Sequence, residues 1–197
     1  MGEQPDSARP GRKRSETSRQ AILTAAAELF GEVGYAGLTI EGIAARAGTG
    51  KQTIYRWWPS KADVLLDALA DKTDLQVPIP DEGSFAADLR AFLAASFALG
   101  RYPQVREVLR AVMAQAQVDV AFGERFRNGF VRRRRDALSV LVDRADAKGE
   151  LPEGVPASTI MDVVFGVIWY RLLVPLGPLD EGLPDELVAL LAGSPSA

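Results

Sequence analysis

Residues 39–61 read TIEGIAARAGTGKQTIYRWWPSK, and this stretch predicts the fold of the N-terminal part of the chain. Thr39 is a favoured N-cap, and the apolar residues after it recur at helical spacing until a glycine ends the helix. A second short helix is expected between Thr49, a candidate N-cap with Gln52 as its capping-box partner, and Pro59, because the residue before a proline avoids the helical region. Two short helices around a glycine-bearing turn are typical of a helix-turn-helix.

The second of these helices carries polar side chains that suit DNA. A recognition helix lies in the major groove with its N-terminal residues at the base edges, while its apolar side, here Ile54, packs on the supporting helices. Gln52 has the geometry to bond adenine, Lys51 or Arg56 to bond guanine, and Thr53 to meet a thymine methyl group or a phosphate. The alternative for Gln52 is that its side chain serves the capping box instead of a base.

Three further residues lie where phosphate contacts would fix the register on DNA, namely Thr39, Tyr55 and Lys61. Of the adjacent tryptophans, we expect Trp58 rather than Trp57 to be mainly a core residue. The predicted DNA contacts are, in full, Thr39, Thr49, Gly50, Lys51, Gln52, Thr53, Tyr55, Arg56, Trp57 and Lys61.

The rest of the chain also has helical periodicity, and no strand-like alternation of useful length interrupts it. A first helix is predicted over residues 15–33, ending at Gly34. Later helices are predicted from Ser60 to about Leu75, over 84–99, from Pro103 onward, and over 120–148, 158–174 and 184–191. The fold class is therefore all-α, with a three-helix helix-turn-helix domain followed by a helical bundle, about nine helices in all.

The composition excludes several classes of chemistry. The chain has no cysteine, which removes disulfides and thiolate chemistry, and no histidine, which removes the commonest general base and metal ligand. We therefore predict no catalytic residue, no metal site and no cofactor. An enzyme built in the helical bundle is disfavoured for the same reason.

Charge and hydropathy indicate where the chain acts. Residues 1–61 carry a balance of +3 and residues 62–197 a balance of −6, so the first third is the part expected to meet an anion. The longest apolar run, 160–174, contains Asp162 and Arg171 and is too short to span a bilayer. The N-terminus lacks the apolar core of a signal peptide. We expect a cytoplasmic protein without a membrane partner.

Residues 15–65 resemble the DNA-binding domain of the TetR family of bacterial transcriptional regulators. The matching positions are the Ala/Leu/Phe pattern ending at Phe30, then Gly34-Tyr35, Thr39, Ile43-Ala44, Ala47-Gly48, Tyr55, Pro59-Ser60-Lys61 and Leu65. The sequence YRWWPSK replaces a more usual ending with one aromatic residue and a phenylalanine. Gly42 and Gly50 stand where larger residues are commoner.

The resemblance implies a homodimer that binds a palindromic operator in double-stranded DNA, and a C-terminal domain that binds a small-molecule effector and then releases the DNA. Two reading heads about 34 Å apart would match successive major grooves. The expected organisation is a disordered basic arm (1–14) that touches phosphates or is merely solvated, a helix-turn-helix domain (15–62), a ligand-binding and dimerisation domain (63–193) and a tail (194–197).

Candidate effector and dimer residues lie in the second of these domains. Aromatic stripes are usually core, but some of these residues are candidates to line a largely apolar pocket. The pocket candidates are Phe92, Phe97, Met113, Phe122, Phe126, Trp169, Tyr170 and Arg171. The helix over 158–174 is apolar almost all round, which favours a dimer seam over the centre of the subunit's own core. The seam candidates are Phe165, Ile168, Trp169, Leu172, Leu187 and Leu190.

Two groups of cations in this domain need partners. Arg171 lies within the apolar helix, where an unpaired charge is costly, so it is expected to pair across the dimer or with an acidic ligand. Arg132 to Arg135 sweep about 300° of a helix, so at least one must point toward protein and pair with Asp136 or an acid on another helix. A DNA-binding patch is the alternative for these four.

The sequence thus predicts a DNA-binding transcriptional regulator, most simply a repressor released by its ligand. The alternatives are an activator or a ligand-independent regulator of the same fold, and a helical interaction protein that does not bind DNA.

Overall fold

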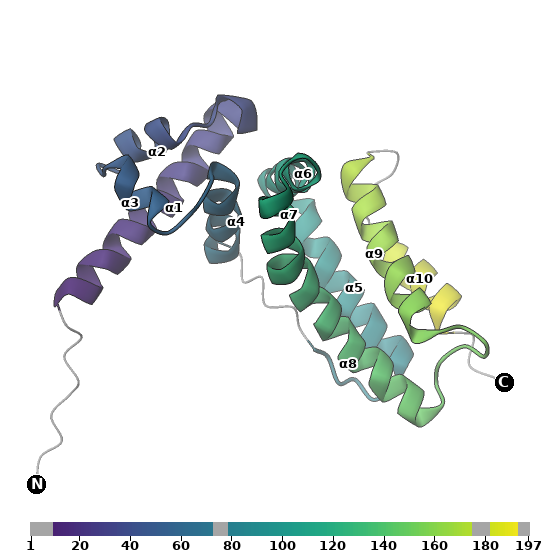
Figure 1. The fold of residues 1–197 in the computed structure, drawn as a ribbon. Coiled ribbons are helices and arrows are strands. Elements are labelled where there is room, and N and C mark those ends of the chain that lie inside the picture. The colour runs from purple at the N-terminus through teal and green to yellow at the C-terminus, as the bar shows by residue number, and fades with distance from the viewer. Residues whose placement is uncertain (1–9, 73–78, 175–181, 193–197) are drawn as a thin grey trace, which may run out of the picture. The chain divides into compact units, whose positions relative to one another are not determined.

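The structure is a computed structural model, and it describes residues 10–72, 79–174 and 182–192. These ranges are helical and contain no strand, which confirms the all-α prediction. The chain divides into two compact units, Met1–Asp74 and Leu75–Ala197 (Figure 1), and each is described by itself.

The first unit contains α1 (Pro10–Gly37), α2 (Ile40–Arg46), α3 (Lys51–Tyr55) and α4 (Lys61–Lys72). Helix α1 begins ahead of the start predicted at Ser15, so residues 10–14 are helical rather than part of a disordered arm, and the remaining arm lies outside the described residues. The predicted break at Gly34 is confirmed, because Gly34 has a φ of 66° and interrupts the helical backbone. A positive φ favours glycine, which has no Cβ.

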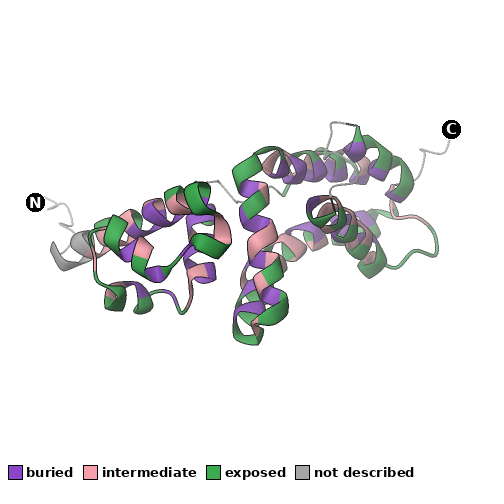
Figure 2. Ribbon diagram, turned by 90° about the horizontal axis from the view of Figure 1, so that it is seen from above, coloured by how far each residue is buried: buried purple, intermediate pink, exposed green. Residues whose placement is uncertain are grey.

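Helix α4 packs along α1 and therefore belongs to the first unit, whereas the sequence analysis placed it after a domain boundary at residue 62. Ser60 begins α4 as predicted, since its Oγ lies 3.4 Å from the backbone N of Asp63 and donates to Asp63 Oδ2 at 2.7 Å. Buried residues lie on the faces that the helices of this unit turn toward one another (Figure 2). They include Ile22, Ala26, Ile43, Ile54, Val64 and Leu65.

The second unit contains α5 (Phe85–Arg101), α6 (Pro103–Val118), α7 (Val120–Phe126), η1 (Arg127–Val131), α8 (Arg132–Lys148), α9 (Ala157–Leu173) and α10 (Leu183–Leu191). Helix α5 packs against α6, α8 and α10, and α9 packs against α8 and α6. The helix predicted over 120–148 is continuous, because the residues at both ends of η1 keep helical backbone angles. Its middle turn, η1, is nevertheless a π-helix.

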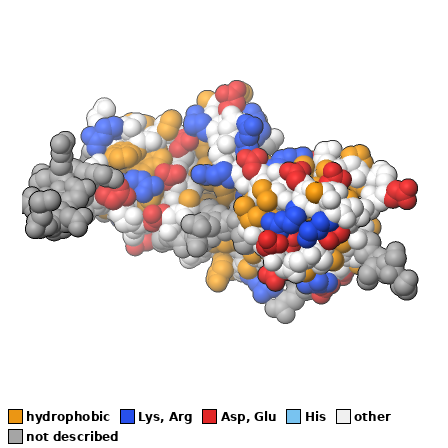
Figure 3. Space-filling view, turned by 90° about the horizontal axis from the view of Figure 1, so that it is seen from below, with side chains coloured by type: hydrophobic (Ala, Val, Ile, Leu, Met, Phe, Trp, Pro, Cys, Tyr) orange, Lys and Arg blue, Asp and Glu red, His pale blue; other side chains and the backbone are white. Residues whose placement is uncertain are grey.

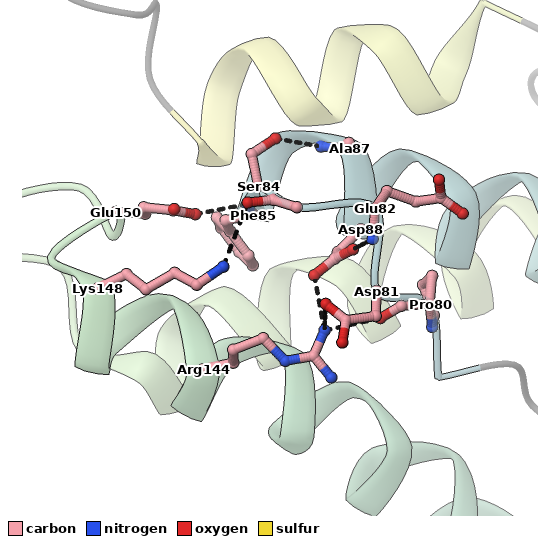
Figure 4. Close-up of polar contacts among 11 residues, drawn as sticks. Pro80, Asp81, Glu82, Ser84, Phe85, Ala87, Asp88, Arg144, Lys148 and Glu150 are labelled. Atoms are coloured by element: carbon pink, nitrogen blue, oxygen red, sulfur yellow. Dashed lines mark hydrogen bonds and ion pairs between the residues drawn. The ribbon is translucent and has the colours of Figure 1, made fainter.

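The start of α5 is tied to the end of α8 (Figure 4). Asp88 is only 2% exposed, and its carboxylate accepts from the backbone N of Glu82 and lies 3.1 Å from an Arg144 guanidinium nitrogen. Glu150 accepts from the backbone N of Phe85 at 2.6 Å. Buried charges need such partners, so these contacts explain how a carboxylate is accommodated inside the bundle.

Candidate DNA-binding surface and effector cavity

The turn between α2 and α3 is built from a cap and a glycine. Thr39 Oγ1 accepts from the backbone N of Gly42 at 3.0 Å and begins α2, as predicted. Gly48 has a φ of 62°, which places the chain in the left-handed region where glycine is favoured, and the backbone then turns toward α3.

Helix α3 begins differently from the prediction. Its N-cap is Gly50, which has no side chain to accept a hydrogen bond, so the capping box of Thr49 with Gln52 is wrong. The N-cap is one residue later than the sequence suggested, so Gln52 lies two residues after it instead of the three that a capping box requires. Gln52 is exposed. The structure thus removes the competing role of Gln52 and leaves base contact as its prediction.

Two buried side chains hold α3 against the first unit. Ile54 is fully buried, and Trp58, just after the helix, is 3% exposed and donates from Nε1 to Asp67 Oδ2 at 2.9 Å. Asp67 Oδ2 also lies 3.3 Å from Arg19, so this carboxylate of α4 joins α1 to the end of the helix-turn-helix. Trp57 is 41% exposed, which confirms that Trp58 is the core residue of the pair.

The opposite side of α3 is open to solvent. Tyr55 is 51% exposed, and the other predicted contacts are exposed as well, except for Thr49, Thr53 and Lys61, which are half-buried. Lys51 Nζ lies 2.9 Å from Glu41 Oε1. This hydrogen bond lowers the pKa of Glu41 and raises the pKa of Lys51. The predicted contact of Lys51 with a base or a phosphate therefore requires its ammonium group to leave the carboxylate of Glu41.

Lys61 has a second task that sequence reasoning missed. Its Nζ donates to the backbone oxygens of Tyr35 at 2.7 Å and Leu38 at 2.9 Å, and it lies 4.3 Å from the centroid of the Tyr35 ring. The ammonium group thus satisfies carbonyls at the end of α1, just before α2 begins. An ammonium has three N–H groups, so one remains for the predicted phosphate contact. The sequence feature that could have indicated this role is Gly34, because a break in the helical backbone there leaves nearby carbonyl oxygens in need of another donor.

The face of the molecule shown in Figure 3 carries charges of both signs. On the face shown in Figure 3, lysine and arginine side chains are interspersed with aspartate and glutamate. The buried anchors behind α3 and its exposed polar side chains are therefore the observations that single out this helix.

The second unit contains a small cavity between α5, α6, α9 and the η1–α8 helix. Its volume is about 40 Å³, room for a few water molecules or a group of similar size rather than for a whole ligand. It is lined by Trp169, one of the predicted pocket residues, together with Ser96, Leu109, Phe130, Arg134 and Phe165. The other predicted pocket residues do not line it. Phe92, Phe97, Phe122 and Phe126 are core, Met113 and Arg171 are half-buried, and Tyr170 is exposed.

The predicted dimer residues fall into two groups. Phe165, Leu172 and Leu187 are buried within the subunit itself, and Ile168 and Trp169 are half-buried. Leu190 on α10 is 68% exposed. The exposed residues of α9 instead include Gly166, Tyr170 and Leu173. None of these was predicted to lie in the dimer seam, and Tyr170 was predicted to line the pocket.

The four consecutive arginines diverge as predicted. Arg132 and Arg133 are exposed, whereas Arg135 lies 2.8 Å from Asp162 on α9. Arg134 turns inward, with its guanidinium carbon 5.4 Å from the centroid of the Phe130 ring. The helical sweep of four consecutive arginines requires at least one to point inward, but it does not determine which one.

Neither a membrane span nor a metal-binding cluster is found in the part of the chain that the structure describes. None of its helices is long and apolar enough to cross a bilayer, and its acidic side chains form no group able to hold a metal ion.

Known families match both units. Residues 22–68 match the family described as bacterial regulatory proteins, tetR family, and residues 79–191 match the tetracyclin repressor-like C-terminal domain. Together these matches span the helix-turn-helix and all the helices of the second unit.

Individual relatives agree with the family matches. An uncharacterized HTH-type transcriptional regulator, YdeS of Bacillus subtilis (strain 168), is 33% identical over 90% of this chain and 89% of its own length. The DNA-binding transcriptional repressor TetR of Mycobacteroides abscessus is 28% identical over 89% of this chain and 92% of its own. The crystal structure of the TetR family transcription regulator SCO0332 covers 87% of this chain and 94% of its own, with 32% identity and a TM-score of 0.68.

Proposed function

The chain belongs to the TetR family of bacterial regulatory proteins, helix-turn-helix transcriptional regulators, and from this we propose that it is a repressor. In this proposal a homodimer binds a palindromic operator and occludes a promoter. A small molecule that binds the second unit then releases the DNA.

The main support for DNA binding is the way α3 is held, with one side buried in the first unit and its polar side chains exposed to solvent. Ile54 and Trp58 anchor the helix from behind, so Lys51, Gln52 and Tyr55 project from a rigid support. Rigid placement matters because a base contact requires donors and acceptors at fixed positions. The name of the Mycobacteroides relative, a transcriptional repressor, supports repression over activation.

The exposed apolar side of α9 and α10 supports the dimer. Tyr170, Leu173 and Leu190 are all more than one-third exposed, and Gly166 on the same side of α9 allows a close approach of another helix. Because one short α3 makes few base contacts, two copies related by a two-fold axis would supply the affinity that an operator needs. In this arrangement Leu190 is the most exposed of the predicted seam residues and would meet the partner directly.

The cavity supports an effector site in the second unit. A ligand shifts the protein away from DNA only if it binds the DNA-incompetent state more tightly. Because the volume is only about 40 Å³, the walls of the cavity must move when a ligand enters. Such a movement would make the ligand-bound conformation differ from the free one, as release of DNA requires. The same small volume also favours the alternative of a ligand-independent regulator.

Selection of genomic DNA fragments by the purified protein tests the proposal. We expect recovered fragments to share a palindrome with half-sites about one helical turn apart. Fluorescence anisotropy with that palindrome then compares the wild type with Gln52→Ala, which should relax preference at one position by about 1–3 kcal/mol. Recovery of fragments without a shared sequence would indicate the alternative of a helical interaction protein.

A promoter fusion separates the remaining alternatives. Removal of the regulator should raise transcription from the operator-bearing promoter if the protein represses. A fall in transcription would identify an activator. A change in operator affinity upon addition of a cell extract of small metabolites would argue against ligand independence.

A further inference from the structure

Two polar side chains face an otherwise apolar cavity in the second unit. Ser96 comes from α5 and Arg134 from α8, whereas the surrounding wall consists of side chains such as Leu109, Phe130 and Trp169. Ser96 is 8% exposed, and its Oγ has no hydrogen-bond partner among the residues that the structure describes. A buried hydroxyl without a partner costs free energy, so a native structure that keeps one generally has a use for it.

Among the described residues that line this cavity, Arg134 is the only cation. No carboxylate in the described part of the chain pairs with it, although its neighbour Arg135 is paired with Asp162. Burial lowers the pKa of Arg134 to about 10, so the guanidinium remains a cation at neutral pH despite the cost of losing water. The guanidinium lies over the Phe130 ring, which attracts it weakly compared with an anion.

The π-helical turn explains why Arg134 is the inward arginine. Residues Arg127–Val131 form this turn directly before α8, and a π-turn takes more residues than an α-turn. It therefore rotates every later side chain of the helix relative to a regular α-helix. Phe130, within the turn, stacks on Phe126 with 5.4 Å between ring centroids. Such turns occur frequently at functional sites, in agreement with a cavity wall made by this one.

From these observations we infer that the cavity binds the carboxylate of a small monocarboxylic acid, held by Arg134 and Ser96, with the acid's apolar body against Phe130 and Trp169. The planar guanidinium matches the two oxygens of a carboxylate, and a serine hydroxyl donates one further hydrogen bond. One cation is neutralised by one negative charge, which favours a monoacid over a diacid or a phosphate. The identification of this acid as the effector rests on the proposed function.

Entry of the acid requires the cavity to widen. Its volume of about 40 Å³ holds little more than the carboxylate, and Ile168 and Trp169 are the half-buried parts of the wall on α9. Their side chains are less confined than the fully buried Phe126 behind them. Displacement of Trp169 would change the environment of an indole that lies in the second unit, whereas Trp57 and Trp58 lie in the first.

Titrations with matched acids and amides test the site. The purified full-length protein is titrated with benzoate, octanoate and decanoate, and separately with benzamide, octanamide and decanamide, while tryptophan fluorescence and thermal unfolding are recorded. We expect at least one acid to bind about 10- to 100-fold more tightly than its amide, the range for hydrogen bonds to a charged group. The fluorescence change should vanish in Trp169→Phe. No binding by any acid, or equal binding of acids and amides, overturns the inference.

Variants identify the residues that recognise the acid. Arg134→Leu should abolish the preference for acid over amide, and Ser96→Ala should weaken acid binding several-fold. Arg134→Lys, which keeps the charge but not the planar fork, should give an intermediate preference. The exposed neighbour provides the control, because Arg133→Leu should leave binding unchanged. Circular dichroism verifies folding of each variant. The assignment is overturned if folded Arg134→Leu keeps the full preference for acid over amide. It is also overturned if a folded double variant, Arg134→Lys with Ser96→Ala, keeps that preference.

A separate measurement of operator affinity distinguishes binding of the acid in the cavity from the role of that acid as an effector. An acid that binds through Arg134 and weakens operator binding supports both. An acid that binds but leaves operator affinity unchanged overturns its role as effector and leaves the carboxylate site in place. A protein that binds the acid but no operator DNA contradicts the proposed function without contradicting the site.

Discussion

Replacement of Lys61 by alanine would separate its structural task from its predicted contact with DNA. In the free protein the Lys61 ammonium donates to the oxygens of Tyr35 and Leu38 at 2.7 and 2.9 Å and lies over the Tyr35 ring. The Lys61→Ala variant leaves the carbonyl oxygens of Tyr35 and Leu38 without the hydrogen bonds that the ammonium group donates. The junction between α1 and α2 should therefore loosen even when no DNA is present.

The magnitude follows from the contacts. Hydrogen bonds to a charged group contribute about 1.5–3 kcal/mol each, and an exposed cation–π contact about 0.5–1 kcal/mol. Because Lys61 is half-buried and water replaces part of what is lost, we expect Lys61→Ala to lower the free energy of unfolding of the first unit by about 2–3 kcal/mol. A direct phosphate contact would in addition reduce the salt slope of DNA binding by about 0.9.

The assay uses a Trp169→Phe background, in which the tryptophan signal comes only from Trp57 and Trp58 of the first unit. Denaturant unfolding followed by this signal gives the stability, and anisotropy at several salt concentrations gives the slope. Lys61→Met is the matched variant, because it keeps much of the apolar stem and removes the charge. An unfolding free energy within about 0.5 kcal/mol of the parent, the range of an ordinary surface substitution, would refute the structural role. An unchanged salt slope would refute the phosphate contact.

Three further predictions concern the second unit. Gly123→Ala should destabilise the protein by about 1–3 kcal/mol in denaturant unfolding, because its Cβ would lie 2.6 Å from the Ala116 carbonyl oxygen, whereas Gly129→Ala, with nothing within 4 Å, should not. Asp88→Ala should cost about 2–3 kcal/mol, because it leaves the backbone N of Glu82 without its acceptor and leaves Arg144 with only the exposed Asp81 and the Pro80 oxygen; a loss below 1 kcal/mol, typical of an exposed pair, would contradict this account. Arg134→Leu should stabilise the ligand-free protein by about 1–3 kcal/mol at pH 7, since the lowered pKa means that burial penalises the charged form. That penalty is fully present below the folded-state pKa of about 10 and decreases as the pH rises through it, so the gain should shrink between pH 9 and 11, and a variant less stable than wild type at pH 7 would disprove the argument.

Features that depend on a few neighbouring residues were accessible from the sequence. Thr39 and Ser60 begin helices because their oxygens accept from backbone N–H groups three residues later. Gly34 interrupts α1 because its backbone takes a positive φ. These are local effects of the backbone, so the all-α fold and the helix-turn-helix could be predicted without knowledge of how the helices pack.

Features that depend on packing were decided only by the tertiary structure. Lys61 meets Tyr35 across 26 residues of chain because α4 lies along α1, and no periodicity encodes that contact. The choice of Arg134 among four arginines depends on the π-helical turn, which shifts the register without changing the apolar spacing that reveals a helix. Phe126 and Trp169 likewise have the same aromatic character in sequence, but the three-dimensional arrangement of the helices buries one in the core and places the other at the cavity.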